Sequence, residues 1–496
     1  MRYLLLALIL CMIGCSKNKP KDLLLTVALE SSPKTMDPRL ATDANGMRIA
    51  SLLFQSLVSL DNNLKVKGEM AESWDVTGNK IKFKLKKDLK FSNGRNVSKE
   101  DYLESIEEYK GKNSPFNSAF KVIKEALFED KEDASYLTLI LDEMSLKFLS
   151  SDLPVLKILP MKELKEDRKA FSEALFGSGA YVLGKHDERE INLSANEFFN
   201  EVIKSKNIKF EIIKDDFTRY QKVFKGEILL AQDVLPAAKI KKFKKDPDFE
   251  IYEFPGLSFS YLLFNLKNKK FENKNLRKAI TLGVDRHSII KFKLMGQGEE
   301  ATSLLTPENA YFNKSLKETE YSLKDAKEAL KALSEEEKTI SVKISNNQEV
   351  VDIAKVIANQ LNKVGFKVNI QSFEWGTFYE DIKKGNYELS MMRWVGAIDP
   401  DIYKMAFDTS EFPPGRNRGF YSNKKVDALL AKGVSELDFA KRKKIYDEVQ
   451  KIIFEERPIV PLWYNKKVTV LSSRLKGYEP RANGDFNSFY KIEFKD

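Results

Sequence analysis

Residues 340–391 switch between two periodicities, and this pattern restricts the fold more than any other feature of the chain. Apolar and polar residues alternate over 340–344, 366–370 and 387–391, as they do in half-buried strands. Between the first two segments, the apolar residues of 350–364 recur at helical spacing. Strands that alternate with helices form parallel sheets, because each helix carries the chain back to the same end of the sheet. The sequence therefore predicts an α/β fold.

Two tryptophans follow strands of this pattern. Trp394 is predicted just past the carboxyl end of the third strand, and Trp375 follows the second strand. Open α/β sheets bind ligands at this edge. We therefore expect both side chains to line a binding site, and the alternative is that both are core aromatics.

Local signals are also clear between Met70 and Asp101. Residues 81–85 alternate as a half-buried strand, and Asn93-Gly94 predicts a turn. Ser98 precedes Asp101 by three residues, which is a variant capping box that would start a helix.

Length and charge limit the class of protein. A chain of 496 residues is too long for one ordinary core, so we expect two or three domains. The formal charge of +10 comes from interspersed residues of both signs. The densest basic run, Lys239 to Lys245, is interrupted by apolar residues and is typical of a solvated helix face. We therefore expect no nucleic-acid partner.

The N-terminus has the features of a targeting segment, and we assign residues 1–21 to a signal peptide and tether. Arg2 precedes an apolar run, 4–13, that is too short to span a bilayer well. Gly14-Cys15 behind this run resembles a lipobox, which predicts cleavage before Cys15 and lipidation of its thiol. An uncleaved anchor and an ordinary secretory signal are the alternatives. Cys11 is the only other cysteine, so the mature chain cannot form a disulfide.

Several short motifs follow one another along the chain. Thr35-Met-Asp-Pro38 and Met70-Ala-Glu-Ser-Trp74 come first, followed by Gly177-Ser-Gly-Ala-Tyr181 and by residues 421–430. In this order they resemble the motifs of the family 5 extracellular solute-binding proteins, the lipid-anchored receptors of peptide importers. The resemblance covers nearly the whole mature chain.

The resemblance implies a two-lobed periplasmic-binding-protein fold, or flytrap, with mixed parallel sheets and an extra small domain. Lobe I would combine residues 22–59, 173–264 and 467–496. Residues 60–172 would form the small accessory domain, and residues 265–466 would form lobe II.

The same resemblance implies a mechanism. The hinge would lie at the two crossings near residues 264 and 467, and ligand would stabilise the closed state by contacting both lobes. In peptide-binding relatives, the main chain of an extended peptide pairs with receptor strands. The implied partners are short peptides or another small solute, the permease subunits of an ABC transporter, and a membrane through the lipid anchor. We expect a monomer.

One family motif is altered in this chain. Oligopeptide receptors carry an aspartate three residues after the equivalent of Trp394, where it contacts the amino terminus of the peptide. Ala397 occupies that position here, and the segment up to Pro400 is one residue shorter than the family pattern. Asp399 or Glu374 is expected to replace the missing acid, unless the ligand lacks a free amino terminus.

These considerations give seven candidate ligand-binding residues: Trp394, Trp375, Gly396, Ala397, Asp399, Arg393 and Thr35. Arg393 is the candidate partner for a ligand carboxylate, and Arg416 and Arg418 are alternatives. For each arginine, the other interpretation is an ordinary surface charge.

Residues for common catalytic sites are missing from the sequence. His186 and His287 are its only histidines, so a zinc cluster of histidine and cysteine cannot form in the mature chain. Gly179 to His186 approximates a phosphate-binding loop, but its Tyr-Val-Leu interior favours a strand. Asp and Glu are numerous, yet no spacing singles out a catalytic pair. We expect no enzymatic activity, no metal and no cofactor.

The predicted function is capture of extended oligopeptides and their delivery to an ABC importer. A non-peptide solute, such as a metal chelate, opine, glycoside or wall fragment, is the first alternative. A surface lipoprotein without a transport role is the second. In each case the protein would be exported and lipid-anchored to the cell envelope.

Overall fold

A computed structural model describes residues 23–62, 64–317 and 319–495 of the chain. Within these residues, a mixed sheet of eleven strands follows the order β15 (Lys367–Phe373), β14 (Thr339–Ser345), β16 (Leu389–Val395), β12 (Phe249–Phe264), β17 (Ile459–Ser472), β11 (Leu230–Gln232), β1 (Leu24–Leu29), β10 (Asn207–Ile212), β9 (Glu190–Ala195) and β8 (Tyr181–His186), with β13 (Gly298–Glu300) paired to β17.

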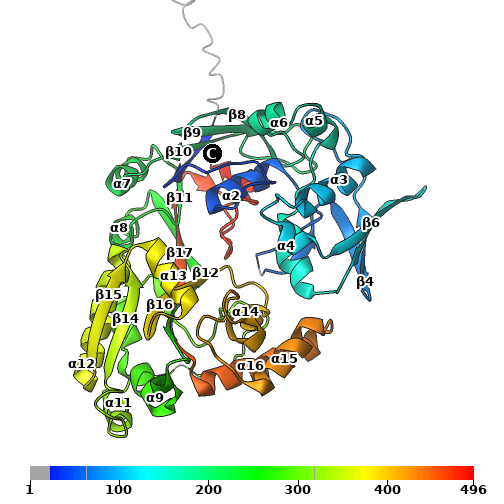
Figure 1. Cartoon of the computed structure of the whole chain (residues 1–496). Coiled ribbons are helices and arrows are strands. Elements are labelled where there is room, and N and C mark those ends of the chain that lie inside the picture. The colour runs from blue at the N-terminus through cyan, green and yellow to red at the C-terminus, as the bar shows by residue number, and fades with distance from the viewer. Residues whose placement is uncertain (1–22, 63, 318, 496) are drawn as a thin grey trace, which may run out of the picture.

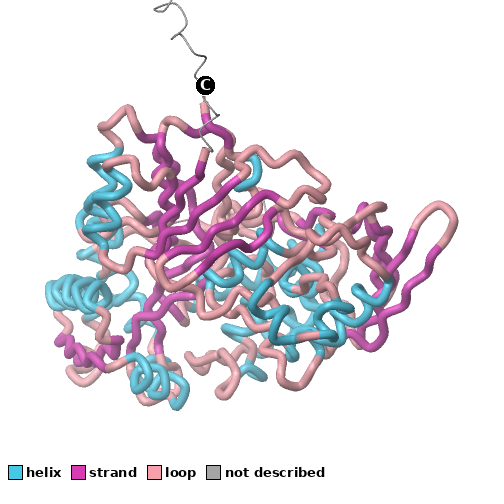
Figure 2. Tube along the Cα trace, turned by 90° about the horizontal axis from the view of Figure 1, so that it is seen from above, coloured by secondary structure: helices cyan, strands magenta, loops and turns pink. Residues whose placement is uncertain are grey.

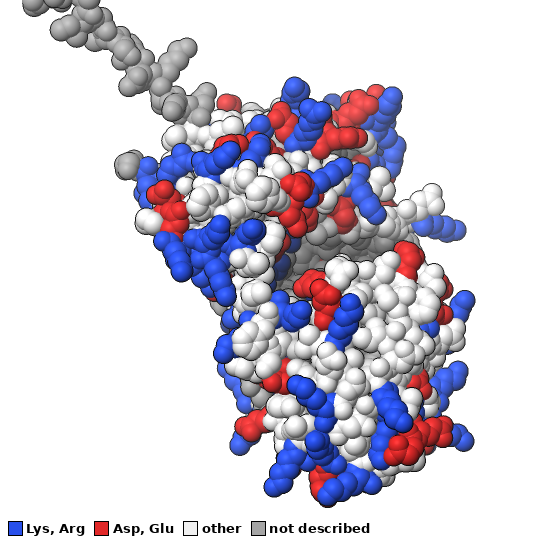
Figure 3. Space-filling view, turned by 90° about the vertical axis from the view of Figure 1, so that its left-hand side faces the viewer, with Lys and Arg blue, Asp and Glu red and all other residues white. Residues whose placement is uncertain are grey.

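The long strands β12 and β17 join the two halves of this sheet. They pair with each other in antiparallel register, and the register shifts between Pro255 and Ser258. On one side of this shift the sheet continues through β11 to β8, and on the other side through β16 to β15. We call these halves, with the helices that cover them, lobe I and lobe II. Figure 1 shows lobe I at the top and lobe II at the bottom, and Figure 3 shows the molecule hollowed between them.

A separate small sheet lies beside lobe I, and one of its hairpins extends away from the body (Figure 2). Its strands follow the order β4 (Ala71–Thr77), β5 (Lys80–Leu85), β7 (Ser135–Leu141) and β6 (Ile123–Asp130). The elements around it are β2 (Val58–Leu60), β3 (Val66–Gly68), α3 (Lys99–Lys110), α4 (Asn117–Phe120), η2 (Phe148–Asp152), η3 (Leu153–Val155), α5 (Met161–Glu166) and α6 (Arg168–Ala174).

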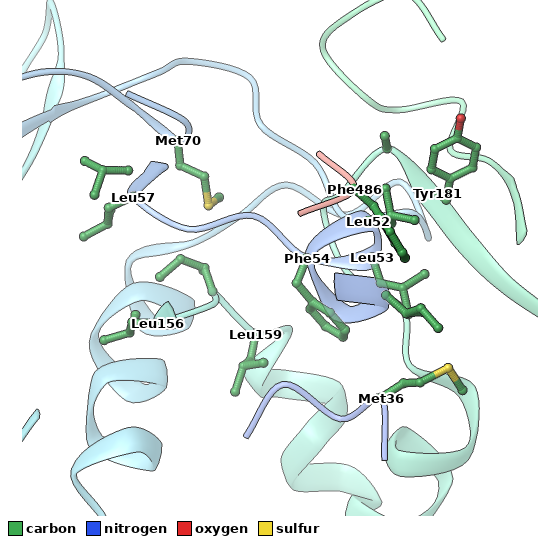
Figure 4. Packing of buried hydrophobic residues seen from close by; sticks show 14 of the residues in the cluster. Met36, Leu52, Leu53, Phe54, Leu57, Met70, Leu156, Leu159, Tyr181 and Phe486 are labelled. Carbon is green, nitrogen blue, oxygen red and sulfur yellow. The ribbon is translucent and has the colours of Figure 1, made fainter. Parts of the chain in front are cut away.

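The small sheet and lobe I share one hydrophobic core. This core joins Leu25 of β1 and Phe83 of β5 in a single buried cluster. Helix α2 (Ala44–Leu53) contributes Leu52 and Leu53, which lie near Phe486 from the end of the chain (Figure 4). Lobe I also contains α7 (Asp216–Phe224), α8 (Ala237–Phe243), β18 (Leu475–Lys476), η6 (Phe489–Lys491) and β19 (Glu493–Phe494).

Lobe II has two hydrophobic clusters of its own, one on each side of its sheet segment. Its helical elements are η4 (Lys269–Glu272), α9 (Lys274–Gly283), α10 (Arg286–Phe292), α11 (Leu323–Leu330), α12 (Gln348–Val364), α13 (Trp375–Lys384), α14 (Ile402–Phe407), η5 (Thr409–Glu411), α15 (Lys424–Ser435) and α16 (Phe439–Glu456). None of the helices in the described part of the chain is both long enough and apolar enough to cross a membrane.

The expected α/β pattern is confirmed in lobe II. Strand β14 pairs in parallel with both β15 and β16, and α12 ends at Gly365, whose φ is 125°. One boundary was predicted wrongly, because β16 continues through Trp394 to Val395. Val395 pairs with Ser258 of β12, so a partner that is distant in sequence extends the strand.

Local predictions elsewhere are confirmed as well. Ser98 and Asp101 form a capping box at the start of α3, and residues 80–85 form β5. The segment that approximates a phosphate-binding loop ends in strand β8, as its apolar interior predicted.

Gly177 and Gly179 explain the glycine motif that precedes β8. A Cβ added at Gly179 would lie 2.4 Å from the carbonyl oxygen of Leu52 and 2.7 Å from the backbone nitrogen of Phe54. The end of α2 therefore packs directly on the backbone of this segment, and both atoms belong to the main chain, which cannot rotate away.

We predict that Gly179→Ala lowers the free energy of unfolding by about 2 kcal/mol, because overpacking of a close backbone contact typically has this cost. Urea denaturation followed by circular dichroism measures the change. Gly376→Ala is the control, because its Cβ would first meet a flexible side-chain oxygen of Glu374, at 3.0 Å. Equal stability of the two variants would contradict the packing argument.

Candidate functional site

A cavity of about 410 Å³ lies between lobe I and lobe II. It falls within the usual range for small-ligand sites, which is roughly 300–1,000 Å³. The hollow visible in Figure 3 lies at this boundary between the lobes. Its walls come from α2, from the η2–η3 segment beside the small sheet, from residues 482–487, and from the adjoining strands β12 and β16.

One face of α2 forms the wall on the side of lobe I. The helix begins after Asp43, whose carboxylate accepts a hydrogen bond from the backbone N–H of Gly46. Its residues spaced at i, i+3, i+4 and i+7 line the cavity: Ala44, Met47, Arg48 and Ser51. Ile49, Leu52 and Leu53 are buried. The amphipathic spacing of the helix therefore fixes which side chains reach the cavity.

The wall on the side of lobe II consists of strand ends. Leu257 and Ser258 of β12 lie opposite Val395 and Gly396 at the end of β16, and Ile398 completes this wall. Val395 is 71% exposed. Gly396 has a φ of 76°, and its N–H donates a hydrogen bond of 3.0 Å to the carbonyl of Leu257. This wall offers a ligand apolar surface, one hydroxyl and backbone groups.

Of the seven candidate ligand-binding residues named from the sequence, Gly396 alone is among the described residues that line this cavity. Trp394 is half-buried and borders a smaller pocket beside Arg416 and Arg418. Trp375 is 56% exposed at the start of α13 and stacks on Tyr379, with ring centroids 5.5 Å apart.

The other candidates lie outside the cavity lining. Ala397 is buried in a hydrophobic cluster of lobe II, and Arg393 is exposed. The hydroxyl of Thr35 accepts a hydrogen bond of 3.1 Å from the backbone N–H of Asp37. Thr35 therefore stabilises its own loop.

Asp399 already has a cationic partner. Its carboxylate accepts hydrogen bonds of 3.1 and 2.8 Å from the fully buried guanidinium of Arg442, which also binds Asp401 at 2.7 Å. Burial raises the pKa of Asp401, and the negative charge of Asp399 adds to this effect. The hydroxyl of Ser150, on η2, lies 3.3 Å from Asp399 and connects the two sides of the cavity. Asp399 is therefore part of a buried ion network.

Sequence reasoning missed the charged residues of the cavity, which are Arg48, Lys157, Lys467 and Asp485. The helical spacing of residues 44–53 was a signal that could have identified Arg48, but it was not used. The other three lie on irregular segments or on a strand shared by the lobes, where no local pattern indicates a cavity. Among the described residues, no cluster of His, Cys, Asp and Glu is arranged to hold a metal ion.

Comparison with known proteins identifies the family. A model of the bacterial extracellular solute-binding proteins, family 5 Middle, matches residues 65–412. The chain belongs to this family. The resemblance read from the short motifs is thereby confirmed.

Curated relatives match this chain along nearly its whole length. The di/tripeptide-binding protein 1 of Pseudomonas aeruginosa is 24% identical over 93% of both chains. The oligopeptide-binding protein AppA of Bacillus subtilis is 26% identical over 95% of this chain and 90% of its own.

Solved structures share its fold. The structure of Bacillus subtilis AppA in complex with a nonapeptide superposes with a TM-score of 0.75 at 25% identity, covering 95% of this chain and 99% of that one. The substrate-binding protein CtaP of Listeria monocytogenes superposes with a TM-score of 0.85 at 22% identity, with the same coverage. The α/β periplasmic-binding fold expected from the sequence is confirmed.

We predict that Asp399→Ala lowers the free energy of unfolding by about 3 kcal/mol, because it leaves the buried Arg442 with one carboxylate fewer. Urea denaturation measures the loss. Asp447→Ala is a matched control, since Asp447 forms a more exposed pair with Lys443 on the same helix as Arg442. The control should lose less than about 1 kcal/mol. A similarly small loss for Asp399→Ala would show that the buried network does not stabilise the fold.

Proposed function

We propose that this solute-binding protein captures short extended peptides between its two lobes and delivers them to an ABC importer. The observation that carries the proposal is the cavity of about 410 Å³ enclosed by α2 on one side and by strand ends on the other. The names of the relatives support peptides as ligands, since these proteins bind dipeptides, tripeptides and oligopeptides.

The strand ends of lobe II suit an extended peptide. Peptide main chains bind to exposed strand edges through backbone hydrogen bonds, which are independent of side-chain identity. Val395 and Gly396 place backbone groups at the cavity wall without bulky polar side chains. Binding of this kind would accept many sequences, because specificity would depend on the ends of the peptide and on its length.

We place the hinge at the register shift of β12. Gly256 and Leu257 are the extra residues of this strand, and they lie opposite Asn465 and Lys466 of β17. The extra residues of a bulge are not paired in the ladder, which is locally disrupted there, so a bend at this point breaks few further ladder hydrogen bonds. The family resemblance implied crossings near residues 264 and 467, so the first crossing that we propose lies earlier in the chain.

Closure would bring η2 against lobe II. The contact between Ser150 and Asp399 is an interaction of this kind, at 3.3 Å. A ligand that contacts both walls would stabilise the closed state in proportion to its difference in affinity for the two states. A permease can then distinguish a loaded receptor from an empty one.

A non-peptide solute is the second candidate. It is favoured by Ala397 in place of the family aspartate and by the pairing of Asp399 with Arg442. Neither residue offers a free carboxylate to a ligand ammonium group.

We further propose that the protein is a monomeric, non-enzymatic lipoprotein exported to the cell envelope. The family, whose members are extracellular solute-binding proteins, supports export and binding without catalysis. The lipobox-like Gly14-Cys15 supports lipidation of Cys15, which lies outside the described residues.

Native mass spectrometry of the protein purified from cells as a form starting at Ser16 tests the ligand class. We expect added masses that fragment as short peptides, because the strand ends of lobe II suit an extended main chain. A single added mass without amide fragmentation would favour the non-peptide alternative.

Metabolic labelling with a palmitate analogue tests the anchor. We expect label in the wild-type protein and none in Cys15→Ser, with the variant released from the membrane fraction, because the thiol is the acylation site. Label that persists in Cys15→Ser would exclude this residue as the attachment point.

A further inference from the structure

The charged groups of the cavity point to the chemistry of the ligand. Among the described residues that line it, three are basic and one is acidic: Arg48, Lys157, Lys467 and Asp485. A charged group that already has an opposite charge beside it in the protein offers little net charge to a ligand. The ligand is therefore attracted by the groups that have no such partner.

Lys467 and Asp485 are already matched. The ammonium of Lys467 lies 2.6 Å from the carboxylate of Asp233. Asp485 lies 3.4 Å from the guanidinium of Arg481 and accepts a hydrogen bond of 2.7 Å from the side-chain amide of Asn483. Each of these two charges therefore has an opposite charge beside it.

Lys157 is matched by Glu69 through Ser56. Its ammonium donates a hydrogen bond of 2.7 Å to the Ser56 hydroxyl, and the Ser56 N–H donates one of 2.8 Å to the Glu69 carboxylate. Burial raises the pKa of Glu69 and lowers that of Lys157, while the charge of each partner opposes these shifts. The pair carries no net charge either as ions or as neutral groups.

Arg48 remains without an acidic partner in the described part of the chain. Its guanidinium lies over the ring of Phe486, 5.6 Å from the centroid, and its side-chain donors have no hydrogen-bond acceptor among the described residues. A Cβ added at Gly484 would lie 3.0 Å from both Nη2 of Arg48 and Nζ of Lys467, so the two cationic groups converge on one point. Gly484 has no side chain that would separate the two groups, and both Arg48 and Lys467 line the cavity.

The wall on the side of lobe II provides no carboxylate that would offset the positive charge of Arg48. Its lining residues are Leu257, Ser258, Val395, Gly396 and Ile398. Asp399 lies behind this wall and is bound to Arg442. A ligand ammonium group would find no unpaired carboxylate there.

We propose that this cavity selects its ligand by an anionic end group, a carboxylate, which Arg48 binds beside Lys467 at Gly484, and that a free ammonium end is not required. The proposal rests on the peptide-binding function and specifies it: the peptide is anchored by its carboxyl end. Arginine suits this role because its planar fork binds a carboxylate through two parallel hydrogen bonds.

The test uses protein freed of bound ligand by unfolding and refolding. It is titrated with a randomised tripeptide library in three forms: unmodified, N-acetylated and C-terminally amidated. Native mass spectrometry gives the bound fraction of each form. For wild-type protein we expect the unmodified and acetylated forms to bind within threefold of each other, and the amide to bind at least tenfold more weakly.

Variants assign the effect to Arg48. In Arg48→Gln, the difference between the acid and the amide should fall below threefold, because the group that distinguishes them is gone. Arg189→Gln removes the same charge from an exposed site on the β8–β9 turn, so it controls for net charge and should keep the full difference.

The outcomes distinguish a failure of the anionic anchor from a failure of peptide binding. Equal binding of acid and amide, or a tenfold loss on acetylation, would overturn the anionic anchor while peptide binding stands. Retention of the difference in Arg48→Gln would also overturn it. If no form binds, peptide binding itself fails, and the anchor fails with it.

Discussion

The antiparallel pairing of β12 with β17 is the constraint on which the rest of the structure depends. It makes the sheets of the two lobes one continuous hydrogen-bonded structure, interrupted by the shift between Pro255 and Ser258. Leu257, Ser258 and Lys467 line the cavity and lie at this crossing. The hinge that we propose therefore lies beside the cavity that we propose for the ligand, and ligand contact at this crossing would be coupled to the relative position of the lobes.

Much of lobe II is readable from the sequence because its elements depend on local patterns. Helix α12 follows the spacing of its apolar residues and ends where Gly365 permits a φ of 125°. The end of β16 is different, since its extension to Val395 depends on pairing with a strand more than a hundred residues away. Local periodicity carries no information about such a partner.

The site was less predictable than the fold, for a related reason. Asp399 has the sequence context of a ligand-binding acid, yet Arg442 reaches it from α16 and binds it in the interior. Whether a charge is available to a ligand is a property of the folded molecule, because it depends on which groups are brought beside it. Arg48 differs from Asp399 in this respect. Helical spacing is enough to place Arg48 on the cavity face of α2, but only the folded structure shows that no acidic partner lies beside it among the described residues.

The core shared by lobe I and the small sheet has a consequence for folding and for movement. A contiguous buried cluster, which includes both Leu25 and Phe83, gives these parts no separate interiors. Proteins open locally in contiguous cooperative units, and the shared cluster makes the small sheet and lobe I contiguous. Amide hydrogens of the small sheet should therefore exchange together with those of β1. The small sheet should also move with lobe I as one rigid body, and Ser150 should move with it.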